Sequence, residues 1–298
     1  MFLTISGATG FIGRRLLALY PPDQHSLVVL GRKNPRLDPL VHYGHWDPAA
    51  GEPSRELLQR SEAVIHLAGE PVSQRWTPAV KAAIRDSRVL GTRHLVSAIG
   101  KLRHRPKTLV CASAVGIYGH RGEEVLPESA PPASGFLPEV CTAWEAEADR
   151  AREYGLRVVK LRIGIVLGAD GGALAAMAPL FRWGLGGVLG SGKQWMSWIH
   201  VDDLARMIQF CVENEAVSGV VNGVAPNPVT NAEFTRQLAG ALHRPALLPA
   251  PEFGVKLLYG EMAQILFASQ RVQPSAAQAA GFSFRYPELR PALDAIFG

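Results

Sequence analysis

A glycine-rich turn near the beginning of the chain has the residue types and the spacing to bind a pyrophosphate. The apolar run 2–6 leads directly into GATGFIG (7–13), and an amphipathic helical pattern follows. We expect the first glycine to allow a tight turn, the second to let the backbone approach a phosphate, and the third to let the helix pack on the strand. Backbone N–H groups at the positive end of the helix dipole would then hold the phosphates, although a purely structural turn is the alternative. The predicted binding residues here are Gly7, Thr9, Gly10, Phe11, Ile12 and Gly13.

The end of the second predicted strand indicates which dinucleotide the turn accepts. A carboxylate about 20 residues after the glycines would hydrogen-bond the 2′-hydroxyl of the adenosine ribose. The strand ends instead in Gly31, Arg32 and Lys33. Two cations suit a 2′-phosphate, which an arginine can bind through two hydrogen bonds, so we predict NADP(H) rather than two merely solvated charges. Asp47, after the third strand, is expected near the adenine or, as an isolated aspartate, in a turn.

A third stretch, VIHLAG (64–69), has the pattern of a buried strand that breaks at a glycine. In a parallel α/β sheet the ligand crevice lies at the carboxyl ends of the strands, so residues that follow this strand are expected to reach the cofactor. His66 is interpreted as a core histidine. The predicted cofactor contacts from this stretch are Leu67, Ala68, Gly69, Glu70 and Arg75.

These motifs lie in a chain whose apolar strand-like runs alternate with segments of helical periodicity. Runs that are apolar throughout and separated by helices indicate a parallel sheet covered on both faces, and right-handed crossovers make it doubly wound. We predict an α/β fold with a Rossmann sheet in a cofactor domain, 1–165. Residues 166–298 are expected to interleave the last sheet elements with a smaller C-terminal substrate lobe. The predicted strands are 2–6, 26–30, 63–67, 108–112 and 156–161, and the predicted helices are 10–19, 77–99, 143–153, 173–183, 201–213 and 230–242.

Composition and charge argue against several other classes of protein. The net charge of the 298 residues is +5, but the basic residues are dispersed, so no nucleic-acid partner is expected. The 3 cysteines are too scattered for a disulfide scaffold or a zinc site, which indicates a reducing compartment and no metal. No uncharged apolar run approaches the roughly 18 residues of a membrane span, and no signal peptide is evident. We therefore expect a cytoplasmic protein with no membrane partner.

Further motifs follow the glycine turn in a fixed order. They are VIHLAG (64–69), CASAVGIYG (111–119), KLRIGIVLG (160–168), SWIHVDDLA (197–205) and VVNGVAPNPVTNAEF (220–234). Together they resemble the atypical or extended short-chain dehydrogenases/reductases, the branch that includes sugar-nucleotide epimerases. The stretch 260–293 resembles the tail of the subgroup called epimerase family protein, so a family-specific segment is placed at about 250–298. The resemblance implies the Rossmann fold and a nicotinamide cofactor, and we place Ile163 of KLRIGIVLG among the cofactor-binding residues.

The resemblance also implies a Tyr-x-x-x-Lys pair, which this chain lacks. In the family the lysine lowers the pKa of a tyrosine one helical turn away, so that the phenol exchanges a proton with a substrate oxygen. A serine at the end of the preceding strand bonds the same oxygen, and Ser113 stands in that place. The cofactor motifs are therefore retained while the usual acid is missing.

Substitutes for the missing acid are ranked by their position in the sequence. Glu139 lies where the helix is expected to pass the nicotinamide, and a buried carboxylic acid there would exchange a proton if its pKa rose. Tyr118 is the other hydroxyl near the predicted site. Cys141 is interpreted as an inert apolar group, and Glu145 and Glu147 as solvated charges on the helix.

Two functions follow from this combination. The first is an NADP-dependent oxidoreductase or epimerase of the atypical short-chain type, which transfers a hydride to or from an unidentified small molecule, a nucleotide-sugar-like one being an option. The alternative is a non-catalytic NADP-binding sensor or scaffold, which the missing pair favours and Ser113 opposes. The substrate and the oligomeric state are left open.

Overall fold

The computed structural model describes residues 1–34, 37–246 and 248–298. Its central feature is a 7-stranded parallel sheet. Ile5 lies opposite both Val29 and Ile65 in register, so the first strand is an interior strand of the sheet. The chain order reverses on either side of this strand, which places the ligand crevice at its carboxyl end. In spatial order the strands are β11 (Gly219–Gly223), β7 (Arg157–Ile163), β5 (Thr108–Ala114), β4 (Ala63–His66), β1 (Phe2–Ser6), β2 (Ser26–Gly31) and β3 (His42–His45).

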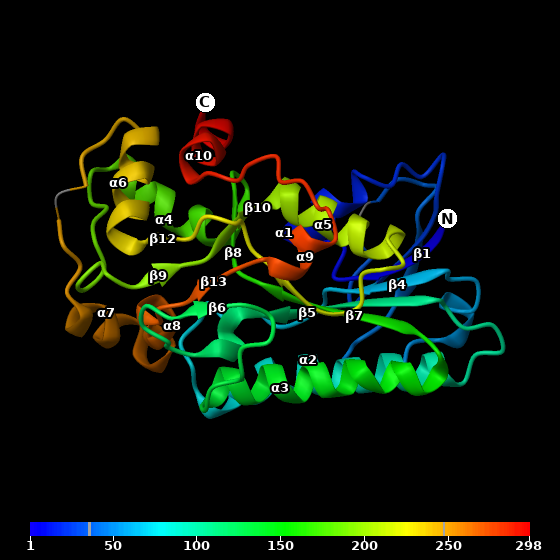
Figure 1. The fold of residues 1–298 in the computed structure, drawn as a ribbon. Coiled ribbons are helices and arrows are strands. Elements are labelled where there is room, and N and C mark those ends of the chain that lie inside the picture. The colour runs from blue at the N-terminus through cyan, green and yellow to red at the C-terminus, as the bar shows by residue number, and fades with distance from the viewer. Residues whose placement is uncertain (35–36, 247) are drawn as a thin grey trace.

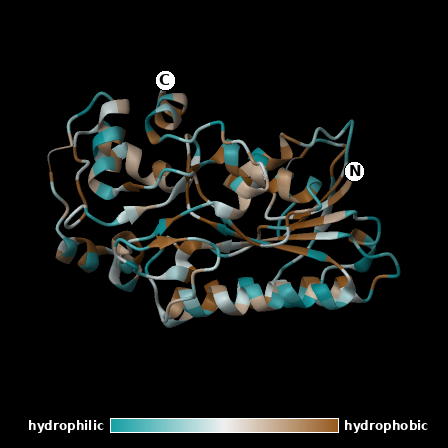
Figure 2. Ribbon diagram, in the orientation of Figure 1, coloured by the Kyte–Doolittle hydropathy of each residue, from teal (hydrophilic) through white to brown (hydrophobic). Residues whose placement is uncertain are grey.

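Helices cover both faces of this sheet (Figure 1). On one face lie α1 (Phe11–Leu17), α5 (Val201–Glu213) and α9 (Ser275–Ala279), and on the other lie α2 (Pro78–Gly100) and α3 (Phe136–Asp149). Each face has its own buried apolar cluster against the sheet. The strands are mainly hydrophobic, whereas α2 and α3 alternate between hydrophobic and hydrophilic residues (Figure 2). The predicted doubly wound α/β fold is therefore confirmed.

A smaller lobe is built mostly from the second half of the chain. Its core surrounds the fully buried Trp198 and Phe234. Three two-stranded ribbons, β8 with β10, β9 with β12, and β6 with β13, join its helices to the sheet. The strands are β6 (Val125–Leu126), β8 (Ile165–Gly168), β9 (Trp195–Met196), β10 (Trp198–His200), β12 (Val229–Thr230) and β13 (Arg271–Val272). The helices are α4 (Gly172–Arg182), α6 (Asn231–Ala241), α7 (Glu252–Tyr259), α8 (Ala263–Phe267) and α10 (Leu289–Phe297). Short 3₁₀ turns lie at Arg55–Leu57, Val115–Tyr118, Arg150–Tyr154 and Gly260–Met262.

Residues 268–273, which we call the interlobe seam, are hydrogen-bonded to both lobes. Toward the sheet, the Ser269 hydroxyl donates to the carbonyl of Gly122 at 2.6 Å. Toward the smaller lobe, the backbone N–H of Gln270 donates to the carbonyl of Trp195 at 3.0 Å. The seam contains β13, which pairs with β6. A segment close to the C-terminal end of the chain thus joins two regions that are far apart in sequence.

The largest difference from the predicted elements concerns α3. The helix was expected at 143–153, but it begins at Phe136 and gives way to a 3₁₀ turn at Arg150. Gly135, with a φ of 115°, precedes it and allows the sharp entry. The earlier start matters because it brings Cys141 and Glu145 onto the same helix. In the described residues, no helix is long and apolar enough to cross a membrane.

Candidate functional site

The glycine turn between β1 and α1 has the close backbone packing that its spacing predicts. Gly7 has a φ of +73°, and a Cβ placed on it would lie 2.7 Å from the carbonyl carbon of Leu67. A Cβ on Gly13 would lie 2.3 Å from the carbonyl oxygen of Gly7. The N–H of Gly10 donates to that same oxygen at 3.1 Å, which closes the turn. Thr9 and Gly10 are exposed, so the turn faces solvent at the carboxyl edge of the sheet.

The start of α1 also contacts the second half of the chain. The ring of Phe11 lies against three glycines, and a Cβ on Gly168, Gly171 or Gly172 would come within 2.7, 2.4 and 2.9 Å of it. Ile12, the next residue, packs against the cluster under α1 and α5. The glycine-rich loop after β8 therefore makes room for an aromatic side chain beside the turn.

Two oppositely charged side chains meet across the carboxyl ends of β2 and β4. Arg32 Nη1 lies 2.6 Å from Glu70 Oε1, and the arginine side chain is 61% exposed. Lys33 is exposed beside it, and the carbonyl of Gly31 accepts a hydrogen bond from Tyr43 at 2.7 Å. The guanidinium predicted to bind the 2′-phosphate is thus held by a carboxylate that was predicted to contact the same cofactor.

This pairing leads to a prediction for Glu70. Replacing Glu70 with glutamine removes the carboxylate that competes for Arg32, so we expect NADPH to bind about 2- to 5-fold more tightly, in line with the weak coupling of exposed ion pairs. Isothermal titration of the variant with NADPH measures this. NADH serves as the control, because without a 2′-phosphate it should show no gain; weaker binding of both dinucleotides would instead place Glu70 on the ribose.

The residues after β4 lie at the carboxyl edge of the sheet, next to the glycine turn. The N–H of Leu67 donates to the carbonyl of Ser6 at 3.1 Å, and Ala68 and Gly69 follow at the surface of the crevice. His66 is fully buried, its Nδ1 lies 2.6 Å from the Ser6 hydroxyl, and burial lowers its pKa to about 4. The histidine is therefore neutral at pH 7.

Three other predicted cofactor residues lie farther from the turn. Arg75 is exposed and lies against Gly260 of the C-terminal segment. Asp47 accepts a hydrogen bond from the N–H of Ala49 at 3.1 Å, which is the turn geometry of its alternative interpretation. Ile163, at the end of β7, packs against both apolar clusters.

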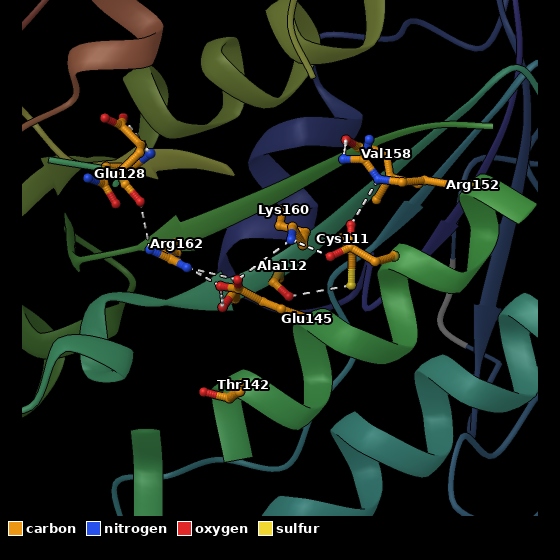
Figure 3. A network of polar contacts seen from close by, with 12 residues as sticks. Cys111, Ala112, Glu128, Thr142, Glu145, Arg152, Val158, Lys160 and Arg162 are labelled. Atoms are coloured by element: carbon orange, nitrogen blue, oxygen red, sulfur yellow. Dashed lines mark hydrogen bonds and ion pairs between the residues drawn. The ribbon is translucent and has the colours of Figure 1, made fainter. Parts of the chain in front are cut away.

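A buried polar network lies at the carboxyl ends of β5 and β7 (Figure 3). The Ser113 hydroxyl donates to Glu145 Oε1 at 2.7 Å. Arg162 binds the same carboxylate through Nε at 2.8 Å and Nη2 at 2.9 Å. Lys160 lies 3.9 Å from Glu145 and 2.5 Å from Asp149. Arg162 thus forms a bidentate ion pair with the carboxylate that accepts the hydrogen bond of Ser113.

Cys141 and Glu145 lie one turn apart on α3, and the carboxylate of Glu145 contacts Ser113. Burial raises the pKa of the Cys141 thiol to about 11, so the thiol is protonated at pH 7. Near the serine, α3 therefore offers a small neutral thiol and a carboxylate, and neither a phenol nor an ammonium group.

A family model for the NAD dependent epimerase/dehydratase family matches residues 3–222. The chain belongs to this family. A second model, for a domain of unknown function, DUF1731, matches residues 250–296, which is the segment expected to be family-specific. The predicted family is confirmed.

Relatives with similar sequences cover nearly the whole chain. The epimerase family protein SDR39U1 homolog of Arabidopsis thaliana, described as chloroplastic, is 42% identical over 99% of this chain and 86% of its own length. The Bacillus subtilis epimerase family protein YfhF is 38% identical over 99% of this chain and 98% of its own length. These names match the subgroup that the C-terminal stretch predicted.

Solved structures agree with the fold. The human epimerase family protein SDR39U1 (isoform 2), crystallised with NADPH, is 36% identical, has a TM-score of 0.88 and covers 99% of both chains. A UDP-glucose 4-epimerase from Thermus thermophilus, in complex with NAD, has a TM-score of 0.78 at 19% identity and covers 100% of this chain and 98% of its own. The second likeness is one of fold alone.

The other two predicted catalytic residues, Glu139 and Tyr118, lie in different surroundings. Glu139 is exposed in the first turn of α3, where it accepts a hydrogen bond from the N–H of Gly135 at 3.3 Å. The buried position assumed for it is wrong, because Glu139 lies on the exposed side of the first turn, where its carboxylate folds back to the N–H of Gly135. Tyr118 is fully buried, donates to Asn222 at 2.8 Å and accepts from Arg162 at 2.9 Å. Its hydroxyl is thus already engaged within the protein.

The carboxylates that sequence reasoning interpreted as solvated are the buried ones. Glu145 and Glu147 are only 7% and 8% exposed. Glu147 is bound by Arg93 at 2.6 Å and by Arg150 at 3.0 Å on the outer side of the α2–α3 pair. A signal for Glu145 was available, because Lys160 and Arg162 interrupt an otherwise apolar buried strand and such charges require partners. In the described part of the chain no group of three or more metal-ligating side chains occurs.

Proposed function

We propose that this protein binds NADP(H) at the carboxyl edge of its sheet and acts there as an oxidoreductase or epimerase on a small molecule. The observation that carries the proposal is the open glycine turn, which leaves no room for a Cβ at Gly7 or Gly13, with Arg32 at the end of the adjacent strand. The human relative crystallised with NADPH supports the choice of dinucleotide. The three free cysteines, all buried, agree with a reducing compartment such as the cytoplasm.

The residues present fit this cofactor. The turn at Gly7–Gly13 would hold the pyrophosphate, Arg32 and Lys33 the 2′-phosphate, and the backbone of Leu67, Ala68 and Gly69 would border the adenosine half. When bound, the nicotinamide supplies a hydride acceptor or donor. What the protein itself supplies is binding, orientation and proton handling.

Proton handling must differ from the family pattern, because no tyrosine faces the serine. The Ser113 hydroxyl donates a hydrogen bond to Glu145 Oε1 at 2.7 Å, so only the lone pairs of its oxygen remain for another partner. A substrate group that donates a hydrogen bond, such as an alcohol, fits this serine better than a carbonyl oxygen. Glu145, which accepts the hydrogen bond of Ser113 and pairs with Arg162, is then the group toward which a proton leaving the substrate would move.

The alternative, a non-catalytic NADP sensor, is favoured by the thiol at Cys141 and the fixed ion pair at Glu145. The two functions separate by incubating the protein with NADP⁺ and a panel of alcohols, and with NADPH and the matching carbonyl compounds, while the nicotinamide absorbance is followed. Turnover that falls at least about 100-fold in Ser113→Ala with unchanged NADPH binding supports the enzyme. Tight NADPH binding without turnover of any compound supports the sensor.

The cofactor choice gives a separate prediction at Arg32. Replacing Arg32 with alanine removes a bidentate partner of the 2′-phosphate, so NADPH binding should weaken by about 10- to 100-fold while NADH binding changes less than 3-fold. Titration calorimetry with both dinucleotides measures the two effects. Equal losses for both would exclude the phosphate contact.

A further inference from the structure

Arg88 of α2 lies beneath the loop that follows β4. Its Nη1 donates to the carbonyl oxygens of Glu70 at 2.9 Å and Ile84 at 3.2 Å. A Cβ on Gly69 would lie 3.1 Å from the guanidinium carbon, so the loop packs closely on the arginine. On the other side the guanidinium stacks over Trp144, 5.2 Å from the ring centroid. The arginine is thus fixed between the proposed cofactor edge and α3.

The charge of Arg88 has no counter-ion in the structure. Among the described residues, no carboxylate oxygen lies within 4.0 Å of its guanidinium, and the residues outside the description, at 35, 36 and 247, carry no carboxylate. The nearby carboxylate of Glu70 is bound to Arg32. Buried and partly buried charges are ordinarily paired, so an unpaired one at a crevice is unusual.

The hydrogen-bonding capacity of Arg88 is also incompletely used. Within the described residues its Nε and Nη2 have no hydrogen-bond acceptor, which leaves the N–H groups on one edge of the fork unassigned. Arg157 makes an informative comparison, since it also lacks a carboxylate but donates through both Nη atoms to four oxygens. The two arginines therefore differ: both Nη atoms of Arg157 are bonded within the protein, whereas only Nη1 of Arg88 is.

The unbonded side of the Arg88 guanidinium lies beside α3, a helix that contains neither the tyrosine nor the lysine of the family's pair. Cys141 and Trp144 are on the same face of that helix, and the charge of Arg88 acts directly on the Cys141 thiol. A cation therefore stands beside the helix in which the chain has no tyrosine or lysine.

We propose that Arg88 binds an oxyanion, a phosphate or carboxylate group, in the crevice between the β4–α2 loop and α3. The inference rests on the proposed NADP(H) function, because that function makes this crevice the reaction site. Two sources can supply the anion: a phosphate of the cofactor, or an acidic group of the substrate. A substrate anion would be held close to Ser113 and Glu145, which would restrict the enzyme to acidic or phosphorylated molecules.

The test compares Arg88→Met, which keeps an unbranched, flexible side chain and removes its charge, with Arg88→Lys, which keeps the charge and loses the fork. Arg85→Gln is the matched control, because Arg85 is on the same helix, is exposed and pairs only with Asp86. Calorimetric titration with NADPH reports on the cofactor. Thermal unfolding of the NADPH-saturated proteins with sodium phosphate or sodium acetate, at constant ionic strength, reports on a second anion.

Each source gives a distinct result. If the cofactor supplies the anion, Arg88→Met weakens NADPH binding by about 10- to 100-fold, Arg88→Lys by less, and Arg85→Gln has no effect. If the substrate supplies it, NADPH binding is unchanged in all variants, while phosphate or acetate raises the Tm of the wild-type complex and not that of Arg88→Met.

The proposal is overturned if Arg88→Met binds NADPH normally and no anion raises the Tm of the wild-type complex. A lower Tm for Arg88→Met in the same experiment would then show that the arginine only braces the loop against Trp144. Should Arg88→Met fail to fold, Arg88→Lys and the wild-type titrations decide on the same criteria. Failure of the wild-type protein to bind NADPH at all would refute the proposed function, and is thereby distinguishable from failure of this inference.

Discussion

Replacing Glu145 with alanine should lower the free energy of unfolding by roughly 3–5 kcal/mol, the cost of leaving a buried partner charge without its counter-ion. Arg162 is only 6% exposed and donates two hydrogen bonds to this carboxylate. A guanidinium is not deprotonated in proteins, so Arg162 cannot escape the loss by shedding its proton. Urea denaturation of the variant at pH 7 measures the change.

Two further variants decide how this loss arises. Glu139→Ala, on the same helix but exposed, should change stability by less than about 0.5 kcal/mol. The double variant Glu145→Leu with Arg162→Met should recover most of the stability, because it removes both charges and keeps the volume. A loss of less than about 1 kcal/mol for Glu145→Ala would mean that solvent reaches Arg162 and that Ser113 is not held by an obligatory anion.

Replacing Gly13 with alanine should weaken NADPH binding by about 100-fold, the effect of losing one or two hydrogen bonds to a charged phosphate. The new Cβ would lie 2.3 Å from the carbonyl oxygen of Gly7 and 2.4 Å from the Cα of Ala8. Both are backbone atoms, so no side chain can move aside, and the turn must separate from α1. Overpacking of this kind should also lower stability by about 1–3 kcal/mol.

The control for this prediction is Gly51→Ala, because a Cβ on Gly51 has no atom within 4 Å. Calorimetry with NADPH and thermal unfolding without it should be run on both variants. A folded Gly13→Ala protein that binds NADPH like the wild type would show that the turn does not contact the pyrophosphate, which removes the basis of the proposed function.

The fold could be predicted where local pattern and burial agree. β1 and α5 begin and end where expected, since one is buried along almost its whole length and the other has a single apolar face. A third strand before Asp47 was expected without bounds, because β3 is an edge strand whose sequence HYGH leaves only Gly44 buried. Edge strands that keep polar side chains in water carry no apolar signal.

The residues that bind the cofactor could be predicted from the sequence more fully than the polar network around Ser113. Glycine spacing depends on neighbours within seven positions, so the turn at 7–13 can be recognised locally. The role of Glu145 cannot be recognised locally, because this helical residue has its partners Ser113 and Arg162 on two strands, 32 and 17 positions away. Only the folded sheet brings these groups together, and a charged residue considered alone is expected at the surface.

The interlobe seam has a consequence for how a ligand enters. Ser269 and Gln270 are hydrogen-bonded to the 115–122 loop on one side and to Trp195 on the other, so the lobes share a continuous hydrogen-bonded strip. These hydrogen bonds oppose a separation of the two lobes. We therefore expect ligands to enter past the exposed glycine turn and Arg32 without the lobes opening, so that a bound dinucleotide would obstruct smaller molecules that follow it.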